Sequence, residues 1–187
     1  FKQRLAKVLM PVLNPTTREW NFNTRVTGLN LANASVGPEG AKFIANALHG
    51  RRNHDGRWVF NSSLRTLNLE FNSIGDEGMV AIALALAPMW VAEDDGSPLP
   101  LNGDDEDNPG LHGTTKGTWV CNKTIQELNL NFCDIGAAGA RALARVIAPR
   151  YQPAYSSSGD CGDNVENSNS DDACGGDGWV FCSGITS

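Results

Sequence analysis

The sequence lacks any hydrophobic run long enough to cross a membrane as a helix. Its longest apolar stretch, Met79 to Ala92, is too short for that role and predicts a buried helix. Basic residues form no run and are not interleaved with aromatic side chains, which disfavours nucleic-acid binding. No secretory signal is visible, and because Phe1 is not an initiator methionine we expect a piece of a longer chain. Neither a membrane nor a nucleic acid is therefore expected as a partner.

Motifs for catalysis and for cofactor or metal binding are also missing. The three histidines, His49, His54 and His112, share no motif, so no Ser-His-Asp or Cys-His arrangement can be assembled from their positions. There is no phosphate-binding loop, no dinucleotide glycine motif and no C-x-x-C pair of the kind found in zinc sites. The sequence therefore predicts a protein that is not an enzyme and that has no cofactor or metal.

Cysteines are few and odd in number, at five. In a chain of 187 residues this argues against a secreted disulfide scaffold and favours a reducing compartment. Cys161 and Cys174 flank an acidic segment, and they either pair under oxidising conditions or remain free thiols. Asn33, Asn61 and Asn122 begin N-x-S/T sequences, which chance explains in a chain this rich in Asn, Ser and Thr.

Acidic residues are concentrated in two segments. Of the 21 acidic residues, 13 lie within 89–118 and 150–178, where Lys116 and Arg150 are the only basic residues. The remainder of the chain therefore has 13 basic and 8 acidic residues. The two segments are also rich in Gly, Ser and Asn and cannot support a core, so they predict mobile, solvated loops. An acidic docking loop or a weak calcium site is the alternative, although no EF-hand spacing is present.

An internal repeat is the strongest feature of the sequence. Three segments that begin at Trp20, Trp58 and Trp119 superimpose without a gap, and a fourth that begins at Trp179 is cut off at Ser187. The first half of each copy alternates as a strand does, with the leucine pairs Leu29/Leu31, Leu67/Leu69 and Leu128/Leu130. A pair of glycines then supplies the turn into a helix. Each helix has apolar residues at i, i+3, i+4 and i+7, which begin at Ala41, Met79 and Ala140.

Such units bury their apolar faces only when they are stacked. We expect the strands to pair into one parallel sheet, with Leu29, Leu67 and Leu128 side by side and the helices on the outer side. A helix is wider than a strand, so the stack should curve with the sheet on its inner, concave side. The predicted fold class is therefore an α/β solenoid with long loop insertions.

The pattern L-x-L-x-x-N/C-x-I/V-G-x-x-G, followed by an Ala/Leu-rich helix, resembles the ribonuclease-inhibitor-like leucine-rich repeats. This class also occurs in the Ran GTPase-activating protein, in NOD-like receptors and in several ciliary proteins. The resemblance implies a right-handed horseshoe with a parallel sheet inside and helices outside. The family's structural turn residue, which bonds the backbone after the strand, falls on Asn72 and Cys133. In the first copy Ala34 occupies that position, so either the turn is weaker there or a neighbouring group takes over the bond.

The repeat defines how the chain is divided, as one leucine-rich-repeat segment over 1–187. Residues 1–19 are expected to be the helix and exit loop of a preceding repeat. The other units are repeat 1 (20–57), repeat 2 (58–118, acidic insert about 89–118), repeat 3 (119–178, acidic insert about 150–178) and the start of a truncated repeat (179–187). The tryptophans Trp20, Trp58, Trp119 and Trp179 are expected to pack where each insert returns to the sheet; an exposed aromatic row used in binding is the alternative.

Outward strand positions should form ladders across the concave face. The predicted partner-binding residues are Asn30, Asn68, Asn129, Glu70, Asn131, Phe71, Phe132, Arg65 and Glu127. Phe71 and Phe132 would be adjacent exposed aromatics, which commonly anchor interfaces. In the alternative interpretation, the asparagines bond along the sheet and the phenylalanines pack under the descending loop.

These features favour a non-catalytic protein–protein interaction scaffold that binds a protein partner on its concave face. Two other functions stay open: a ligand-sensing module of a larger receptor-like protein, and a GTPase-activating role of the Ran type, for which no catalytic residue can be carried over. We expect a cytoplasmic location, cytoskeletal or ciliary among the possibilities, and further repeats in the parent chain.

Overall fold

The structure is a computed structural model that describes residues 5, 8–92, 117–148, 150–152 and 178–180. A three-stranded parallel sheet has the order β3 (Gly28–Asn30), β6 (Thr66–Asn68) and β9 (Glu127–Asn129). Leu29 pairs with Leu67, which pairs with Leu128, so the predicted register is confirmed. Backbone hydrogen bonds continue the pairing beyond the strands, for example from Phe71 N–H to the carbonyl of Asn131 at 3.0 Å.

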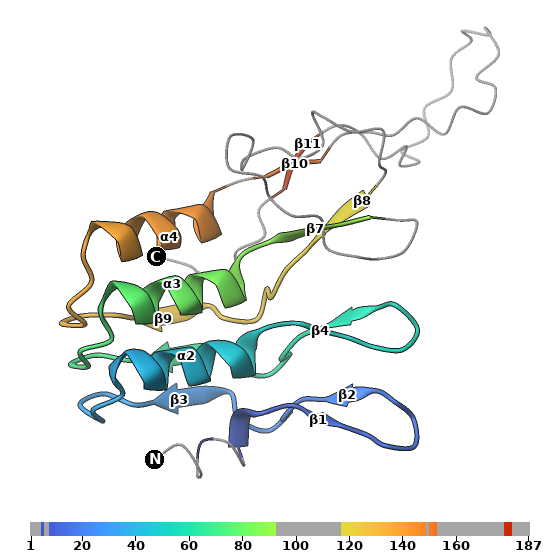
Figure 1. Cartoon of the computed structure of the whole chain (residues 1–187), viewed down its shortest axis with the longest axis horizontal. Coiled ribbons are helices and arrows are strands. Elements are labelled where there is room, and N and C mark those ends of the chain that lie inside the picture. The colour runs from blue at the N-terminus through green and yellow to red at the C-terminus, as the bar shows by residue number, and fades with distance from the viewer. Residues whose placement is uncertain (1–4, 6–7, 93–116, 149, 153–177, 181–187) are drawn as a thin grey trace, which may run out of the picture.

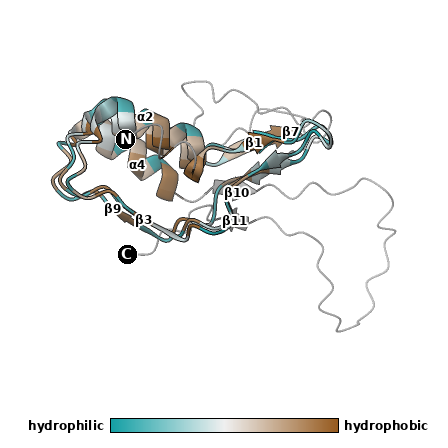
Figure 2. Cartoon of the chain, turned by 90° about the horizontal axis from the view of Figure 1, so that it is seen from below, coloured by the Kyte–Doolittle hydropathy of each residue, from teal (hydrophilic) through white to brown (hydrophobic). Residues whose placement is uncertain are grey.

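Three helices cover one side of this sheet: α2 (Gly37–Leu48), α3 (Gly75–Leu86) and α4 (Ala137–Ile147). Each strand leads through a short turn into its helix, and the units lie one above another with α3 between α2 and α4 (Figure 1). In the view along the stack, the helices superimpose and so do the strands of the sheet (Figure 2). The molecule is thus an α/β stack of equivalent units.

The core lies between sheet and helices and is densest in the middle unit. Leu67, Leu69 and Ile82 are at most 1% exposed. Full burial of such a side chain stabilises the fold by about 1.5–3 kcal/mol. The predicted apolar stripes of α2 and α3 are buried. In α4 the predicted stripe is not, since Ala140, Ala144 and Ile147 are exposed and Leu143 is half-buried. Among the described helices only α3 packs against α4, whereas α3 lies between two helices, and this accounts for the greater exposure of α4.

The two glycines of each repeat have different roles, whereas the sequence predicted that both form the turn. Gly37 and Gly75 adopt left-handed backbone with φ of +60° and +62°, as the turn before the helix requires. Gly78 instead allows close helix packing, because a Cβ there would lie 2.8 Å from the Cβ of Ala41. In the third repeat the equivalent glycine, Gly136, is not left-handed, with φ of −94°. Asp134, two residues earlier, has φ of 55°, as its counterpart Ser35 does in the first repeat at 51°.

Antiparallel strand pairs connect each helix to the next repeat, and the sequence did not predict them. They are β1 (Val12–Leu13) with β2 (Trp20–Asn21), β4 (Arg51–Arg52) with β5 (Trp58–Val59), β7 (Met89–Ala92) with β8 (Gly117–Val120), and β10 (Arg150–Gln152) with β11 (Gly178–Val180). The expected single helix over Met79 to Ala92 is wrong, since α3 ends at Leu86 and the chain after Pro88 forms β7.

The ends of both acidic inserts are likewise strands rather than loops. The residues between them, 93–116 and 153–177, lie outside the described residues, and so do Cys161 and Cys174. The repeat boundaries chosen at the tryptophans fall on the second strand of each pair, so every strand pair spans two repeats.

The recurrent tryptophans lie on these returning strands. Trp119 is 8% exposed and packs edge to face on Trp90, with ring centroids 5.3 Å apart. Trp20 remains partly exposed, with the guanidinium of Arg51 5.7 Å from its ring centroid. Their place, where the connection returns to the sheet, is the one expected from the sequence.

Neighbouring repeats are also joined by a helix cap. No side chain of α4 itself caps its start, but Asp76 at the start of α3 accepts hydrogen bonds from the N–H groups of Gly136 (2.7 Å) and Gly139 (2.9 Å).

We expect Asp76→Ala to lower the free energy of unfolding by about 1 kcal/mol, the usual effect of losing a cap. Urea unfolding measures the loss. Glu77→Ala is the control, because its exposed ion pair with Lys42 contributes little. Equal losses in the two variants would contradict a capping role for Asp76.

Candidate interaction surface

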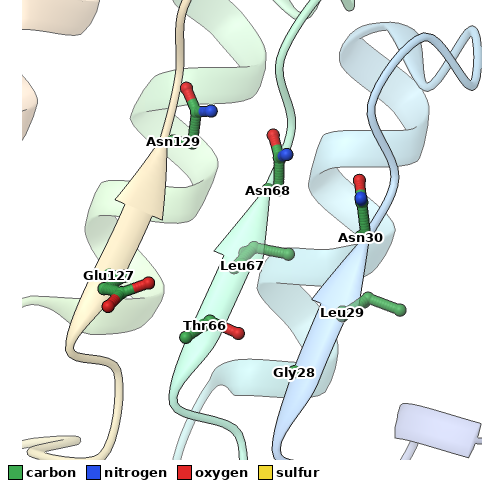
Figure 3. A pocket seen from close by; sticks show the side chains of 8 residues that line it. All are labelled: Gly28, Leu29, Asn30, Thr66, Leu67, Asn68, Glu127 and Asn129. Atoms are coloured by element: carbon green, nitrogen blue, oxygen red, sulfur yellow. The ribbon is translucent and has the colours of Figure 1, made fainter.

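The face of the sheet opposite the helices contains a groove of about 380 Å³. Its lining residues come from all three strands and are Gly28, Leu29, Asn30, Thr66, Leu67, Asn68, Glu127 and Asn129 (Figure 3). Four of the predicted site residues, the three asparagines and Glu127, are therefore brought together there. The parallel register makes this possible, because equivalent positions of adjacent strands lie side by side.

The asparagine ladder is partly structural. Asn30, Asn68 and Asn129 project from the carboxyl ends of the strands (Figure 3). The Oδ1 atom of each accepts a hydrogen bond from the backbone N–H two residues later, at 3.0, 2.9 and 3.1 Å. These bonds hold the turn that follows each strand. A partner is thus offered mainly the Nδ2 donors, rather than the whole amide groups that the sequence suggested.

The charged site residues are spread along the length of the strands. Arg65 and Glu127 are exposed at the start of β6 and β9, whereas Glu70 is half-buried beyond the end of β6. Asn131, in the corresponding position of the third repeat, is exposed. The Nδ2 atom of Asn129 lies 3.4 Å from Oε2 of Glu70. Among the residues that the structure describes, the ion pairs involve other side chains, and the exposed side chains of Arg65 and Glu127 face solvent.

Phe71 and Phe132 form a stacked, exposed pair at the ends of neighbouring strands. Their ring centroids are 4.6 Å apart, the rings are parallel to within 1°, and the side chains are 54% and 72% exposed. Both residues adopt left-handed backbone, with φ of 53° and 54°, as does Asn33 at the same position of the first repeat. For a bulky side chain this conformation is rare and is strained by about 1–3 kcal/mol. The predicted adjacency is therefore present, and no described segment packs over the rings.

Asn72 holds the turn after β6 and also the turn of the preceding repeat. Its side chain is 2% exposed, and Nδ2 donates to the carbonyl groups of Leu31 and Leu69, both at 2.8 Å. Its Oδ1 accepts hydrogen bonds from the N–H groups of Ala34 (3.1 Å) and Val36 (2.9 Å). The missing polar residue at Ala34 is thus replaced by a neighbouring group, the second of the two possibilities left open by the sequence.

Cys133 occupies the same position in the third repeat. Its Sγ donates to the carbonyl of Leu69 at 3.0 Å, and the residue is 2% exposed. Burial raises the pKa of this thiol, so the unreactive neutral form is favoured. The structure therefore places Cys133, like Asn72, in a turn rather than in reactive chemistry.

A second set of asparagines has a structural role that the sequence analysis did not predict. Asn23, Asn61 and Asn122 follow the tryptophans at a constant spacing, and each Oδ1 accepts backbone hydrogen bonds in the turn before the strand. Asn61 and Asn122 are only 2% and 4% exposed. Their N-x-S/T sequences therefore have a structural explanation, and the constant W-x-x-N spacing was the signal that could have revealed it.

The described part of the chain lacks the features of two other kinds of site. None of its helices combines the length and apolar character needed to cross a bilayer. Within the same residues, His, Cys, Asp and Glu side chains form no group of three or more that could hold a metal ion.

The sheet, helices and turns define a repeat protein built from strand–turn–helix units. Comparison with protein families identifies the kind of repeat: the Leucine Rich repeat family matches residues 60–83 and 121–144. The two matches begin at equivalent positions of repeats 2 and 3, in the register of the parallel sheet. They support assignment as a leucine-rich repeat protein, a family whose members generally mediate protein–protein interactions. No curated protein and no solved structure matches the chain.

Proposed function

We propose that this chain is a non-catalytic interaction segment of a curved, right-handed leucine-rich-repeat solenoid of the ribonuclease-inhibitor-like class. A protein partner is held on the concave sheet face and on the adjoining phenylalanine pair. The observation that carries the proposal is the stack of Phe71 and Phe132, which is exposed although it is strongly apolar.

Energetics support a binding role for this pair. Aromatic side chains, phenylalanine among them, are enriched at the cores of protein interfaces, because they bury a large apolar area on binding. The stack contributes little to the core, since both rings are more than half exposed. Strained backbone conformations also concentrate at functional sites. Both properties fit a surface that is completed by a partner.

The repeat class, location and extent of the protein form part of the same proposal. The turn positions occupied by Asn72 and Cys133, and the glycine pairs before the helices, support the ribonuclease-inhibitor-like class. Cys133 donates a hydrogen bond as a free thiol, which fits a reducing cytoplasmic environment. In this proposal the parent chain continues into further repeats that extend the concave face.

Quantitative affinity purification from cell extract tests the binding surface. The double variant Phe71→Ala/Phe132→Ala and the single variant Glu70→Lys are compared with the unmodified chain. We expect each to reduce recovery of specific partners about tenfold or more, as loss of central interface residues does. Leu84→Ala is the matched control, because Leu84 is 67% exposed on α3, away from the sheet face. Unchanged recovery with the double variant would exclude this surface as the binding site.

A further inference from the structure

The groove and the phenylalanine pair form one continuous surface. Asn129 lines the groove, and its Nδ2 atom lies 3.4 Å from the carboxylate of Glu70, which immediately precedes Phe71 in the chain. A peptide segment that crosses the strands at this level therefore meets the amide donors, a carboxylate and the aromatic rings together.

The charge of this surface is negative at the end that carries the phenylalanines. Glu70 and the exposed Asp134 lie on either side of the pair in sequence, and both carboxylates act electrostatically on the thiol of Cys133 between them. Residues 27–33, 65–71 and 126–132 contain one cation, Arg65. It precedes Glu70 by five residues, about 16 Å of extended chain. Solvent ions screen interactions over that distance, so Arg65 does not neutralise Glu70.

We propose that this surface binds an extended peptide segment of the partner that places an arginine side chain on the phenylalanine pair. The inference rests on the proposed function and adds the chemistry of the partner. A guanidinium stacks on the electron-rich face of a phenyl ring, and the carboxylate of Glu70 supplies the opposing charge. The Nδ2 groups of Asn30 and Asn68 are donors for carbonyl oxygens of the same peptide.

Other peptide chemistries fit this surface less well. An acidic segment would be repelled by Glu70 and Glu127, and like charges brought together at an interface are unfavourable. A purely apolar segment would cover the phenylalanines but would remove the nearby carboxylate from water without a partner. Lysine carries the same charge, yet its ammonium is more strongly hydrated and cannot stack as a plane on the ring. Arginine satisfies both the rings and the carboxylate.

Selection from a random peptide display library tests the proposal. Peptides are selected on the full chain and then screened for loss of binding to the Phe132→Ala variant. We expect surface-dependent peptides to be enriched in arginine. For an individual peptide, replacing that arginine by its neutral isostere citrulline should weaken binding about tenfold in fluorescence polarisation, and replacement by lysine should weaken it less. The Glu70→Arg variant should instead prefer acidic peptides.

Matched controls separate this site from general attraction to an acidic chain. Glu77→Gln removes a carboxylate of α3 that pairs with Lys42 and does not line the groove, and Leu84→Ala removes an exposed apolar side chain; neither should alter binding. Equal loss with Glu77→Gln and Glu70→Gln would show general charge attraction and overturn the proposal. Peptides that depend on Phe132 but show no arginine enrichment would overturn it while leaving the proposed function intact. If no peptide depends on Phe132, both proposals fail.

Discussion

Asn72→Ala should lower the free energy of unfolding by about 3–5 kcal/mol, more than any other polar substitution in the described sheet. The buried amide bonds five backbone groups in two adjacent repeats, at Leu31, Ala34, Val36, Leu69 and Glu70. Alanine would leave those groups without partners, and each buried unsatisfied group costs about 1–3 kcal/mol before relaxation. Urea unfolding followed by circular dichroism measures the change, provided that the slope of the transition stays constant.

Two comparisons identify the cause of that loss. Asn30→Ala removes an exposed asparagine whose Oδ1 accepts one hydrogen bond, so we expect a decrease of about 1 kcal/mol or less. Asn72→Cys introduces the residue found at the same position of the third repeat, and its thiol can retain one donor bond. The free energy of unfolding of the cysteine variant should therefore lie between those of the alanine variant and the original chain. If Asn72→Ala were no more destabilising than Asn30→Ala, the role assigned to this amide in two turns would be wrong.

The sheet register and the helices could be predicted because their signal is periodic. Apolar side chains recur at every second position in the strands and at i, i+3, i+4 and i+7 in the helices, and three copies reinforce the same pattern. The alignment of Leu29 with Leu67 and Leu128 follows directly from superimposing the copies. The adjacency of Phe71 and Phe132 follows in the same way, since both are four residues beyond those leucines.

The antiparallel strand pairs could not be found by that method. All four paired strands in the first two connections are only two residues long, and no alternation of side chains can be recognised over so short a length. Connections between their strands also differ in length from one repeat to the next. These pairs depend on backbone hydrogen bonds, which most residue types can form.

Details of the candidate surface were hidden for a different reason. An asparagine at the end of a strand can present its amide to a partner or use its Oδ1 to hold a turn, and the residue type does not distinguish the two uses. The left-handed backbone at Phe71 and Phe132 was equally unexpected, because such positions are normally signalled by glycine or asparagine. Asn33, at the same position of the first repeat, was the one hint of this conformation.

Stability and binding are linked at the turn after β6. Asn72 directly follows Phe71, so its bonds to both repeats fix the backbone that presents the aromatic ring. Without them, the strained left-handed conformation would have less support from its surroundings. The buried amide therefore belongs to the framework that positions the proposed binding surface, although it does not itself face a partner.

Leu67→Ala should lower the free energy of unfolding by about 3–4 kcal/mol. Leu67 is the middle member of the leucine row, 1% exposed, with Leu29 and Leu128 paired on either side. Truncation removes the free energy gained by burying the side chain and leaves a cavity that neighbours on both sides must fill. The paired backbone on both flanks restricts how far the sheet can collapse into it, so the loss should lie in the upper half of the usual range. Chemical unfolding provides the measurement.

Leu84→Ala is the matched control for this substitution, because the same atoms are removed from a side chain that is 67% exposed on α3. We expect it to change the free energy of unfolding by less than about 0.5 kcal/mol. The difference between the two variants measures how much the stack depends on its shared leucine row. If Leu67→Ala and Leu84→Ala had equal effects, burial between sheet and helices would not be the main source of stability, and the proposed solenoid would lose its physical basis.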